Sequence, residues 1–229
     1  FIDQHLSETV EQLRTHQIPA IDIAVIEAVA ITEQGGIIPT TSVGNSASFA
    51  ILADKVIIEI NLSQSDTLEG LHDIYIPSRR PSRQPIPVVS PESRVGFPFI
   101  PIDPDKIAAI VVTEKRDSSS TILPPDDGTR NIAGHLAEFL GNEVRLGRLT
   151  NELQPLQAGI GTIANAVMHG FIDTPFHNLK MYSEVLQDST FDLFDAGKLD
   201  FASGSSITLS QAKYQQVITD MAHYKHKLI

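Results

Sequence analysis

The chain has 229 residues, 41% of them hydrophobic and 20% charged, which is typical of a globular protein and too apolar for global disorder. Its formal net charge of −11 argues against a nucleic-acid partner and against a polybasic membrane-surface protein. The absence of cysteine excludes disulfides, thiolate metal sites and a cysteine nucleophile. It agrees with a reducing compartment, so we expect a cytoplasmic protein, or a mitochondrial one if the source is eukaryotic. No run of about 18 apolar residues occurs, so we expect no membrane partner.

The first part of the chain alternates between helix and strand signals. Apolar residues at i, i+4, i+8 and i+11 predict an amphipathic helix over about residues 1–17. An Ile- and Val-rich run predicts a buried strand over 21–31, and a short extended piece is expected at 37–39. A short helix within 44–53 and a second buried strand over 56–60 follow. This alternation indicates an α/β layer.

The middle of the chain is rich in proline. Eight of the 14 prolines fall within residues 77–104, and neither a helix nor a central strand tolerates that density. We therefore predict a semi-rigid linker over 77–104. It would join the end of an N-terminal domain, residues 1–76, to the front part of a second α/β domain, residues 105–229.

A second α/β run follows the proline-rich segment. It begins with a strand over 108–113 and an exposed loop over 117–128, in which Asp126 or Asp127 can cap a helix that runs to about Gly147. Five apolar residues are expected to form the buried stripe of this helix: Ile132, Leu136, Phe139, Leu140 and Val144.

The last third contains shorter elements. An extended piece at 153–157 leads into a glycine turn and a helix that ends near Met168. A strand is then expected over 179–186, a helix over 191–199 and another helix over 210–224.

Two features of this part could carry chemistry. Residues 159–164 (GIGTIA) place a glycine turn between an extended segment and a helix, where unpaired amides attract phosphate, carboxylate or a developing oxyanion. Glu184 lies near the carboxyl end of the predicted strand over 179–186, where open α/β sheets bind ligands. Because the two features fall on adjacent βα units, we expect them to face one crevice.

Two chemistries can use this pair, and the spacing does not choose between them. In a dinucleotide-binding module, the turn holds a pyrophosphate and an acid about 20 residues later bonds the ribose. Alternatively, Glu184 attacks an activated acyl group while the amides of the turn stabilise the oxyanion. Pro155 weakens the strand that a dinucleotide-binding motif requires, which favours the nucleophile slightly.

Other chemistries have weaker signals. None of the eight histidines has the spacing of a known metal motif, so we expect no metal site. No G-x-S-x-G sequence surrounds Ser183 or the serines at 118–120, which argues against a serine hydrolase.

Longer stretches of sequence are more specific than these motifs. Six of them carry a family resemblance: residues 31–45, 53–61, 71–77, 101–110, 156–167 and 182–188. Through them the chain resembles the acetyl-CoA hydrolase/transferase family, which includes succinyl-CoA:acetate CoA-transferases. The resemblance implies a fold of two open CoA-transferase-like α/β layers, both incomplete here, because family members are about twice as long.

The resemblance also implies a covalent mechanism. Glu184 matches the catalytic glutamate, which forms an acyl-glutamyl anhydride and then a glutamyl-CoA thioester. Gly159, Ile160, Gly161 and Thr162 match the loop that contacts coenzyme A, and the Ile160 amide would donate to the oxyanion. Acyl-CoA is then a substrate rather than a prosthetic group, and the second substrate is a short-chain carboxylate such as acetate.

The same resemblance leaves the reaction outcome open. If water intercepts the acyl intermediate, the enzyme is an acetyl-CoA hydrolase rather than a CoA-transferase. A nucleotide-binding module without chemistry remains a third reading. The full-length protein is expected to form a homodimer. The chain is expected to be a fragment that carries the nucleophile and only part of the site. The assignment requires that Glu184 does not face solvent and lies on the same side of the sheet as residues 159–161; otherwise the chain is an α/β piece with no assigned site.

Overall fold

The computed structural model describes residues 2–116, 118 and 122–229. Part of the predicted loop over 117–128 and the first residue of the predicted helix over 1–17 lie outside this range. The chain divides into two compact units, one of Phe1–Val88 with Arg94–Arg116 and the other of Val89–Ser93 with Asp117–Ile229. Each unit is mixed α/β and is described by itself below.

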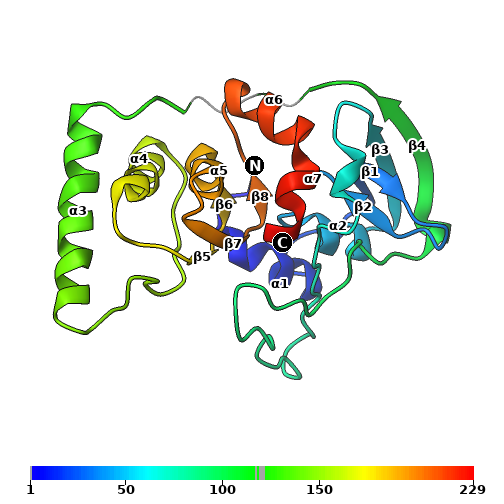
Figure 1. Cartoon of the computed structure of the whole chain (residues 1–229). Helices are drawn as coiled ribbons and strands as arrows, with labels where there is room; N and C mark the ends of the chain where they lie inside the picture. Colours follow the sequence, from blue (N-terminus) through cyan, green and yellow to red (C-terminus); the bar gives the residue numbers. More distant parts are fainter. Residues whose placement is uncertain (1, 117, 119–121) are drawn as a thin grey trace. The chain divides into compact units, whose positions relative to one another are not determined.

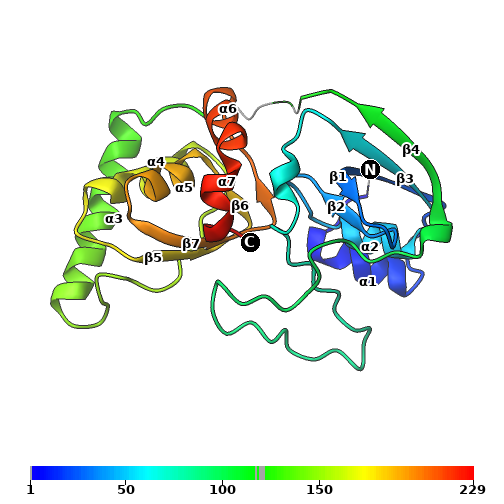
Figure 2. The same ribbon diagram turned by 45° about the vertical axis from the view of Figure 1, so that its right-hand side comes forward.

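The first unit is built on a four-stranded sheet in the order β2-β1-β3-β4. Strands β1 (Ile23–Ile31), β3 (Lys55–Asn61) and β4 (Ile107–Thr113) are parallel, and β2 (Ile37–Pro39) is antiparallel to β1. Helices α1 (Thr9–Arg14) and α2 (Ser46–Leu52) lie on one side of the sheet (Figure 2). The sequence predicted each of these elements, with boundaries shifted by a few residues. It assigned the strand over 108–113 to the second α/β run, however, whereas β4 pairs with β3 in the sheet of the first unit.

The sheet of the first unit buries one face. Ala24, Ile26 and Ala28 alternate along β1 with more exposed residues and pack with Val56 and Ile58 of β3 in the core. On the other face, Val25 of β1 keeps 62% of its surface exposed. The period of two in burial is the pattern expected of a strand with one covered face.

The proline-rich segment contains little regular structure. Residues 77–88 and 94–104 belong to the first unit, and Val89–Ser93 belongs to the second. Residues 77–103 form neither a helix nor a strand, and a short 3-10 helix, η3 (Pro104–Lys106), begins at residue 104. The density of proline explains this. The linker role and the boundaries at residues 76 and 104 remain predictions.

The second unit has two pairs of parallel strands (Figure 1). Strand β5 (Leu179–Tyr182) pairs with β7 (Leu199–Ser203), and β6 (Val185–Leu186) pairs with β8 (Ser206–Ile207). Five helices belong to this unit among the described residues: α3 (Asp127–Arg145), α4 (Thr162–Gly170), α5 (Asp188–Asp195), α6 (Gln211–Thr219) and α7 (Met221–Tyr224).

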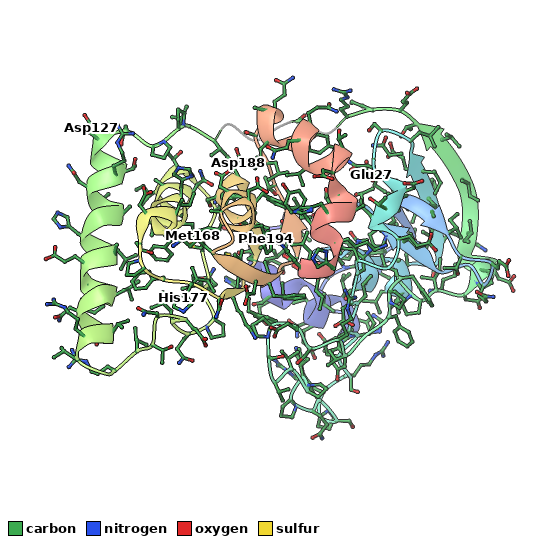
Figure 3. All side chains as sticks on the ribbon, in the orientation of Figure 1. Glu27, Asp127, Met168, His177, Asp188 and Phe194 are labelled. Atoms are coloured by element: carbon green, nitrogen blue, oxygen red, sulfur yellow. The ribbon has the colours of Figure 1, made fainter. Side chains whose placement is uncertain are left out.

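The core of the second unit is aromatic. Phe191 of α5 packs edge-on against Tyr224 of α7, with ring centroids 5.1 Å apart, and Phe171 packs edge-on against Phe176. Met168 on α4 and Phe194 on α5, both labelled in Figure 3, are also buried. Edge-to-face contacts of this kind add to the hydrophobic stabilisation of the core.

The predicted buried stripe of helix α3 is wrong for three of its residues. Ile132, Leu136 and Phe139 are exposed, and Ala133 is buried instead. Helices α3 and α4 approach closely at this point, since a Cβ atom on Gly170 of α4 would lie 2.9 Å from the Ala133 Cβ. The small residue Ala133, rather than Ile132, Leu136 or Phe139, therefore lies at the close approach of α3 to α4.

Helix α3 begins as predicted. Asp126 is its N-cap, and the carboxylate accepts a hydrogen bond of 2.8 Å from the Thr129 amide. The Thr129 hydroxyl in turn lies 2.9 Å from the Asp126 amide, which completes a capping box.

The predicted helix over 191–199 is displaced, and a strand was missed. Helix α5 spans Asp188–Asp195 and ends at Gly197, which has a φ of 64°. The Gly197 amide donates to Phe194 O and the Lys198 amide donates to Leu193 O, the pattern of a Schellman cap. The chain can then enter β7 at Leu199.

The predicted continuous strand over 179–186 is two strands. Strand β5 ends at Tyr182 and β6 begins at Val185, and each pairs with a different partner. Ser183 and Glu184 lie at the break between them. The change of partner depends on distant segments, β7 and β8, and the residues over 179–186 do not encode it by themselves.

Candidate active site

The glycine turn, defined here as residues 158–161, precedes helix α4. Leu156 forms a parallel bridge to Met181 of β5, so the turn leaves the sheet edge just before α4 begins at Thr162. Gly161 is the N-cap residue of α4, with φ 124° and ψ 174°. As a glycine it has no side chain that could cap the helix. This backbone conformation is accessible essentially to glycine alone, which explains the residue type at this position.

Glu184 lies at the bend between β5 and β6. Its backbone carbonyl accepts hydrogen bonds from the Ser205 amide at 2.8 Å, the Ser205 hydroxyl at 2.9 Å and the Ser206 amide at 3.2 Å. Its side chain is exposed. The backbone of Glu184 is therefore held in place by the loop between β7 and β8, while no described residue is hydrogen-bonded to its carboxylate.

Two side chains next to Glu184 bind the glycine turn. The Ser183 hydroxyl lies 3.2 Å from the Ala158 amide, which donates to it, and 3.0 Å from the Ala158 carbonyl, which accepts from it. Gln187 lies beyond β6. Its Oε1 accepts from the Gly161 amide at 2.9 Å, and its Nε2 donates to the Gly159 carbonyl at 3.4 Å. The segment that carries Glu184 is thus hydrogen-bonded to the turn at both ends.

These contacts divide the amides of the turn into two classes. The amides of Ala158 and Gly161 are bound by Ser183 and Gln187. Within the described part of the chain, no acceptor binds the central amides of Gly159 and Ile160. The Ile160 side chain is 67% exposed. Unpaired amides beside a helix N-terminus can donate to an anion.

The structure therefore brings together residues that the sequence placed about 25 positions apart. Gly159, Ile160 and Gly161 lie in the turn that is hydrogen-bonded to Ser183 and Gln187, the residues that flank Glu184 and Val185–Leu186, and Thr162 opens helix α4. The expectation that Glu184 points away from solvent is not met, because no described segment of this chain covers its side chain. The sequence indicated no role for Gln187 and no positive role for Ser183, although both are polar residues that flank the predicted nucleophile.

A reciprocal contact joins α4 to α5 near the turn. The Asn165 Oδ1 atom on α4 accepts a hydrogen bond of 2.9 Å from the Ser189 amide in the first turn of α5, and both residues are buried. Asp188, labelled in Figure 3, begins α5 and accepts from the Ser210 amide and hydroxyl at 2.9 and 2.5 Å. These contacts fix the start of α5 on both sides.

The first unit contains a separate buried polar cluster that the sequence did not reveal. Glu27 of β1 (Figure 3) accepts hydrogen bonds from the Thr40 hydroxyl at 2.7 Å and from Asn61 Nδ2 at 2.6 Å. His72 Nε2 lies 3.0 Å from the Thr40 carbonyl. Burial lowers the pKa of His72, and the charge of Arg94 acts in the same direction, while the hydrogen bond to Thr40 opposes them. Burial therefore favours the neutral form of His72.

Neither a metal site nor a membrane span is found among the described residues. They contain no group of three or more His, Cys, Asp or Glu side chains placed to hold a metal ion. None of the described helices has the length and hydrophobicity needed to cross a bilayer.

Solved structures share the fold of this chain. A 4-hydroxybutyrate CoA-transferase from Porphyromonas gingivalis aligns with 93% of this chain at a TM-score of 0.62 and 18% identity, and 46% of that chain is covered. RipA from Yersinia pestis aligns with 94% of this chain at a TM-score of 0.60 and 13% identity, with 43% of RipA covered. The fold is that of the CoA-transferases.

Sequence comparison narrows this class to one family. Residues 1–112 match the acetyl-CoA hydrolase/transferase N-terminal domain. The whole chain is 42% identical to a succinyl-CoA:acetate CoA-transferase from Clostridium kluyveri and 42% identical to an acetyl-CoA hydrolase from Saccharomyces cerevisiae. The chain belongs to the acetyl-CoA hydrolase/transferase family. It spans 43% and 44% of the lengths of these two relatives.

Proposed function

We propose that this chain carries the nucleophile of an acyl-CoA:carboxylate CoA-transferase, and that Glu184 is that nucleophile. The observation that supports the proposal is that residues on both sides of Glu184, namely Ser183 and Gln187, are hydrogen-bonded to the glycine turn, whose Gly159 and Ile160 amides lack an acceptor among the described residues. A carboxylate next to free amides is the arrangement that acyl transfer through a covalent enzyme intermediate requires.

The proposed reaction has two covalent intermediates. A Glu184 carboxylate oxygen attacks the thioester carbonyl carbon, the C–S bond breaks, and an acyl-glutamyl anhydride and CoA thiolate form. The thiolate then attacks the glutamyl carbonyl of the anhydride, which releases the first carboxylate and leaves a glutamyl-CoA thioester. An acceptor carboxylate reverses both steps and leaves as the new acyl-CoA. The exchange needs no ATP, because one thioester is made for each thioester consumed.

The glycine turn would stabilise the charge that develops in each addition. Negative charge gathers on the carbonyl oxygen as the tetrahedral intermediate forms, and a fixed N–H donor lowers its energy. The Ile160 amide is the donor we propose, since the Gly161 amide is already bound by Gln187. Gly159, Gly161 and Thr162 would shape the loop that contacts coenzyme A.

Hydrolysis is the second candidate, and two observations favour it. Seven of the relatives that match the chain over its whole length are named acetyl-CoA hydrolase, and Glu184 is exposed in this chain. Water that reaches the anhydride would give free carboxylate and regenerate Glu184. Transferase and hydrolase therefore differ in how well the site excludes water. The partners of the proposed transferase are acyl-CoA and a short-chain carboxylate, and we propose a homodimer for the complete protein.

The test is substitution of Glu184 in the gene product that carries this sequence. Glu184→Ala should lower CoA exchange by roughly 10⁴-fold or more, because the covalent route is lost. Glu184→Asp should lower it by about 100-fold, because the carboxylate is withdrawn by about 1 Å. Glu138→Ala, which removes an exposed glutamate on α3, is the matched control and should leave exchange unchanged.

A trapping experiment identifies the intermediate directly. Borohydride added with acyl-CoA should reduce the glutamyl-CoA thioester, and mass spectrometry should find the modification at Glu184. Acceptor dependence then separates the two reactions, since acetate should accelerate CoA exchange in a transferase and leave release of free CoA unchanged in a hydrolase. If Glu184→Ala instead retains exchange, or loses only affinity for NAD or ADP, the nucleophile proposal is wrong.

A further inference from the structure

Gln187 occupies an unusual position for a helix N-cap residue. It immediately precedes α5, but its side chain makes no hydrogen bond to the α5 backbone. The side chain instead spans the glycine turn, accepting from the Gly161 amide at 2.9 Å and donating toward the Gly159 carbonyl at 3.4 Å. Gln187 keeps 3% of its surface exposed, so its carboxamide is hydrogen-bonded to the turn rather than to water.

An amide in the first turn of α5 is bound by a residue of α4. Asn165 of α4 accepts from the Ser189 amide, so each helix start is capped by a residue of the other helix. Gly161 and Gln187 are the N-cap residues of α4 and α5. The exchange of caps ties the turn and the segment after Glu184 into one hydrogen-bonded unit. The Asn165–Ser189 bond is buried and the two Gln187 bonds are part-buried. Breaking a bond to a buried group is costly because it leaves that group unsatisfied.

We infer that Gln187 is a positioning residue that sets the orientation of the Ile160 amide relative to Glu184. Its two hydrogen bonds grip the residues immediately before and after Ile160, and they leave the Ile160 amide without an acceptor in the described part of the chain. Ser183 supports the other end of the turn through Ala158. The inference rests on the proposed function, because it assigns Gln187 a role only through Glu184 and Ile160.

The two bonds should act on the transition state more than on substrate binding. The oxyanion forms only as the tetrahedral intermediate forms, so a misplaced donor lowers kcat while the ground-state contacts to acyl-CoA remain. A shift of about 1 Å in such a group can cost about 100-fold in rate. A residue with a merely structural role would lower the folded fraction instead, and would leave kcat per folded molecule unchanged.

The experiment compares three variants of the gene product that carries this sequence. Gln187→Met keeps the length of the side chain and removes both hydrogen bonds. It should lower kcat for CoA exchange by roughly 10- to 100-fold and change KM for acyl-CoA by less than about twofold. Gln154→Met makes the same change at an exposed glutamine before the turn and should leave both parameters unchanged. Hydrogen–deuterium exchange of residues 158–161 should accelerate in Gln187→Met alone.

Gln187→Glu adds a pH signature. When protonated, the introduced carboxyl group can accept from the Gly161 amide and donate to the Gly159 carbonyl, as the glutamine does. When ionised, it loses the donor and places a negative charge beside the developing oxyanion. The activity of Gln187→Glu relative to the unchanged protein should therefore rise as the pH falls, with a midpoint above about 4.3 because burial raises the pKa of a carboxyl group.

Failure of this inference is separable from failure of the proposed function. If Glu184→Ala abolishes exchange while Gln187→Met keeps a normal kcat per folded molecule, the positioning role is wrong and the nucleophile stands. A flat ratio of activities across pH for Gln187→Glu would also overturn the positioning role. If Glu184→Ala retains exchange, the proposed function itself is wrong.

Discussion

At the scale of single residues, the backbone of Glu184 is held by hydrogen bonds and its carboxylate is accessible. Three donors from Ser205 and Ser206 bind the Glu184 carbonyl, while its carboxylate has no hydrogen-bond partner among the residues that the structure describes. A nucleophile needs a fixed backbone because attack depends on distance and angle. It also needs a carboxylate that is not occupied by a cation or a donor.

His72 gives a prediction about pH and stability at the same scale. Its folded-state pKa is lowered by burial, so the unfolded chain binds a proton more readily than the folded one as the pH falls below about 6.5. The stability contributed by neutral His72 is complete above that pH and is lost as the pH falls toward the folded-state pKa. We expect the free energy of unfolding to fall by about 1 kcal/mol more between pH 7.5 and 5.5 than it does in His72→Gln.

Urea unfolding at the two pH values measures this difference. His16→Gln, a change at an exposed histidine of the same unit, should keep the pH dependence of the unchanged chain. An equal pH dependence in His72→Gln and the unchanged chain would show that His72 is not the group responsible.

At the scale of elements, backbone geometry explains where the helices of the second unit begin and end. Gly197 closes α5 in a Schellman cap, and Gly161 opens α4 with a φ of 124°. The sequence placed the start of α4 correctly because the glycine turn is a local signal. It misplaced α5 because the apolar residues over 191–199 continue past the Gly197 cap into β7.

The two glycines of the turn give a matched pair of substitutions. A Cβ atom on either Gly159 or Gly161 would meet no atom within 4 Å, but Gly161 alone has a positive φ. Gly161→Ala should therefore destabilise the second unit by about 1–3 kcal/mol through backbone strain, and Gly159→Ala by no more than about 0.5 kcal/mol. Chemical denaturation measures both. Equal effects would mean that crowding or lost contacts, rather than the φ of Gly161, limit the turn.

At the scale of the whole molecule, the chain spans less than half the length of the curated relatives it matches. Glu184 is exposed in it, and an acyl intermediate that water can reach is hydrolysed. In the proposed function, the glycine turn would supply one face of the site. Catalysis of transfer requires that the bound acyl group be enclosed.

We therefore expect the isolated 229-residue chain to transfer CoA poorly or not at all. The measurement is steady-state exchange between acyl-CoA and acetate with the purified chain, with its circular dichroism recorded to show that it is folded. Robust transfer by the folded chain would show that the described residues are sufficient for the reaction, and the expectation that the site is incomplete would be wrong.

The sequence by itself determined the features that depend on neighbouring residues. Runs of Ile and Val over 21–31 and 56–60 predicted strands, although β1 is buried on one face only. A cap at Asp126 or Asp127 and the glycine turn before α4 were also predicted from local chemistry. The family resemblance also came from contiguous stretches of sequence, and both the fold and the relatives confirm it. These features need no knowledge of which distant segments meet.

Only the tertiary structure decided the features that depend on distant partners. The break of the strand at Ser183 and Glu184 follows from pairing with β7 and β8, and the buried face of α3 follows from its close approach to Gly170. The grip of Gln187 on Gly161 joins residues 26 positions apart. The physical reason is common to all three: a side chain's burial and hydrogen bonds are set by whatever the fold brings against it, and periodicity along the chain carries no record of that partner.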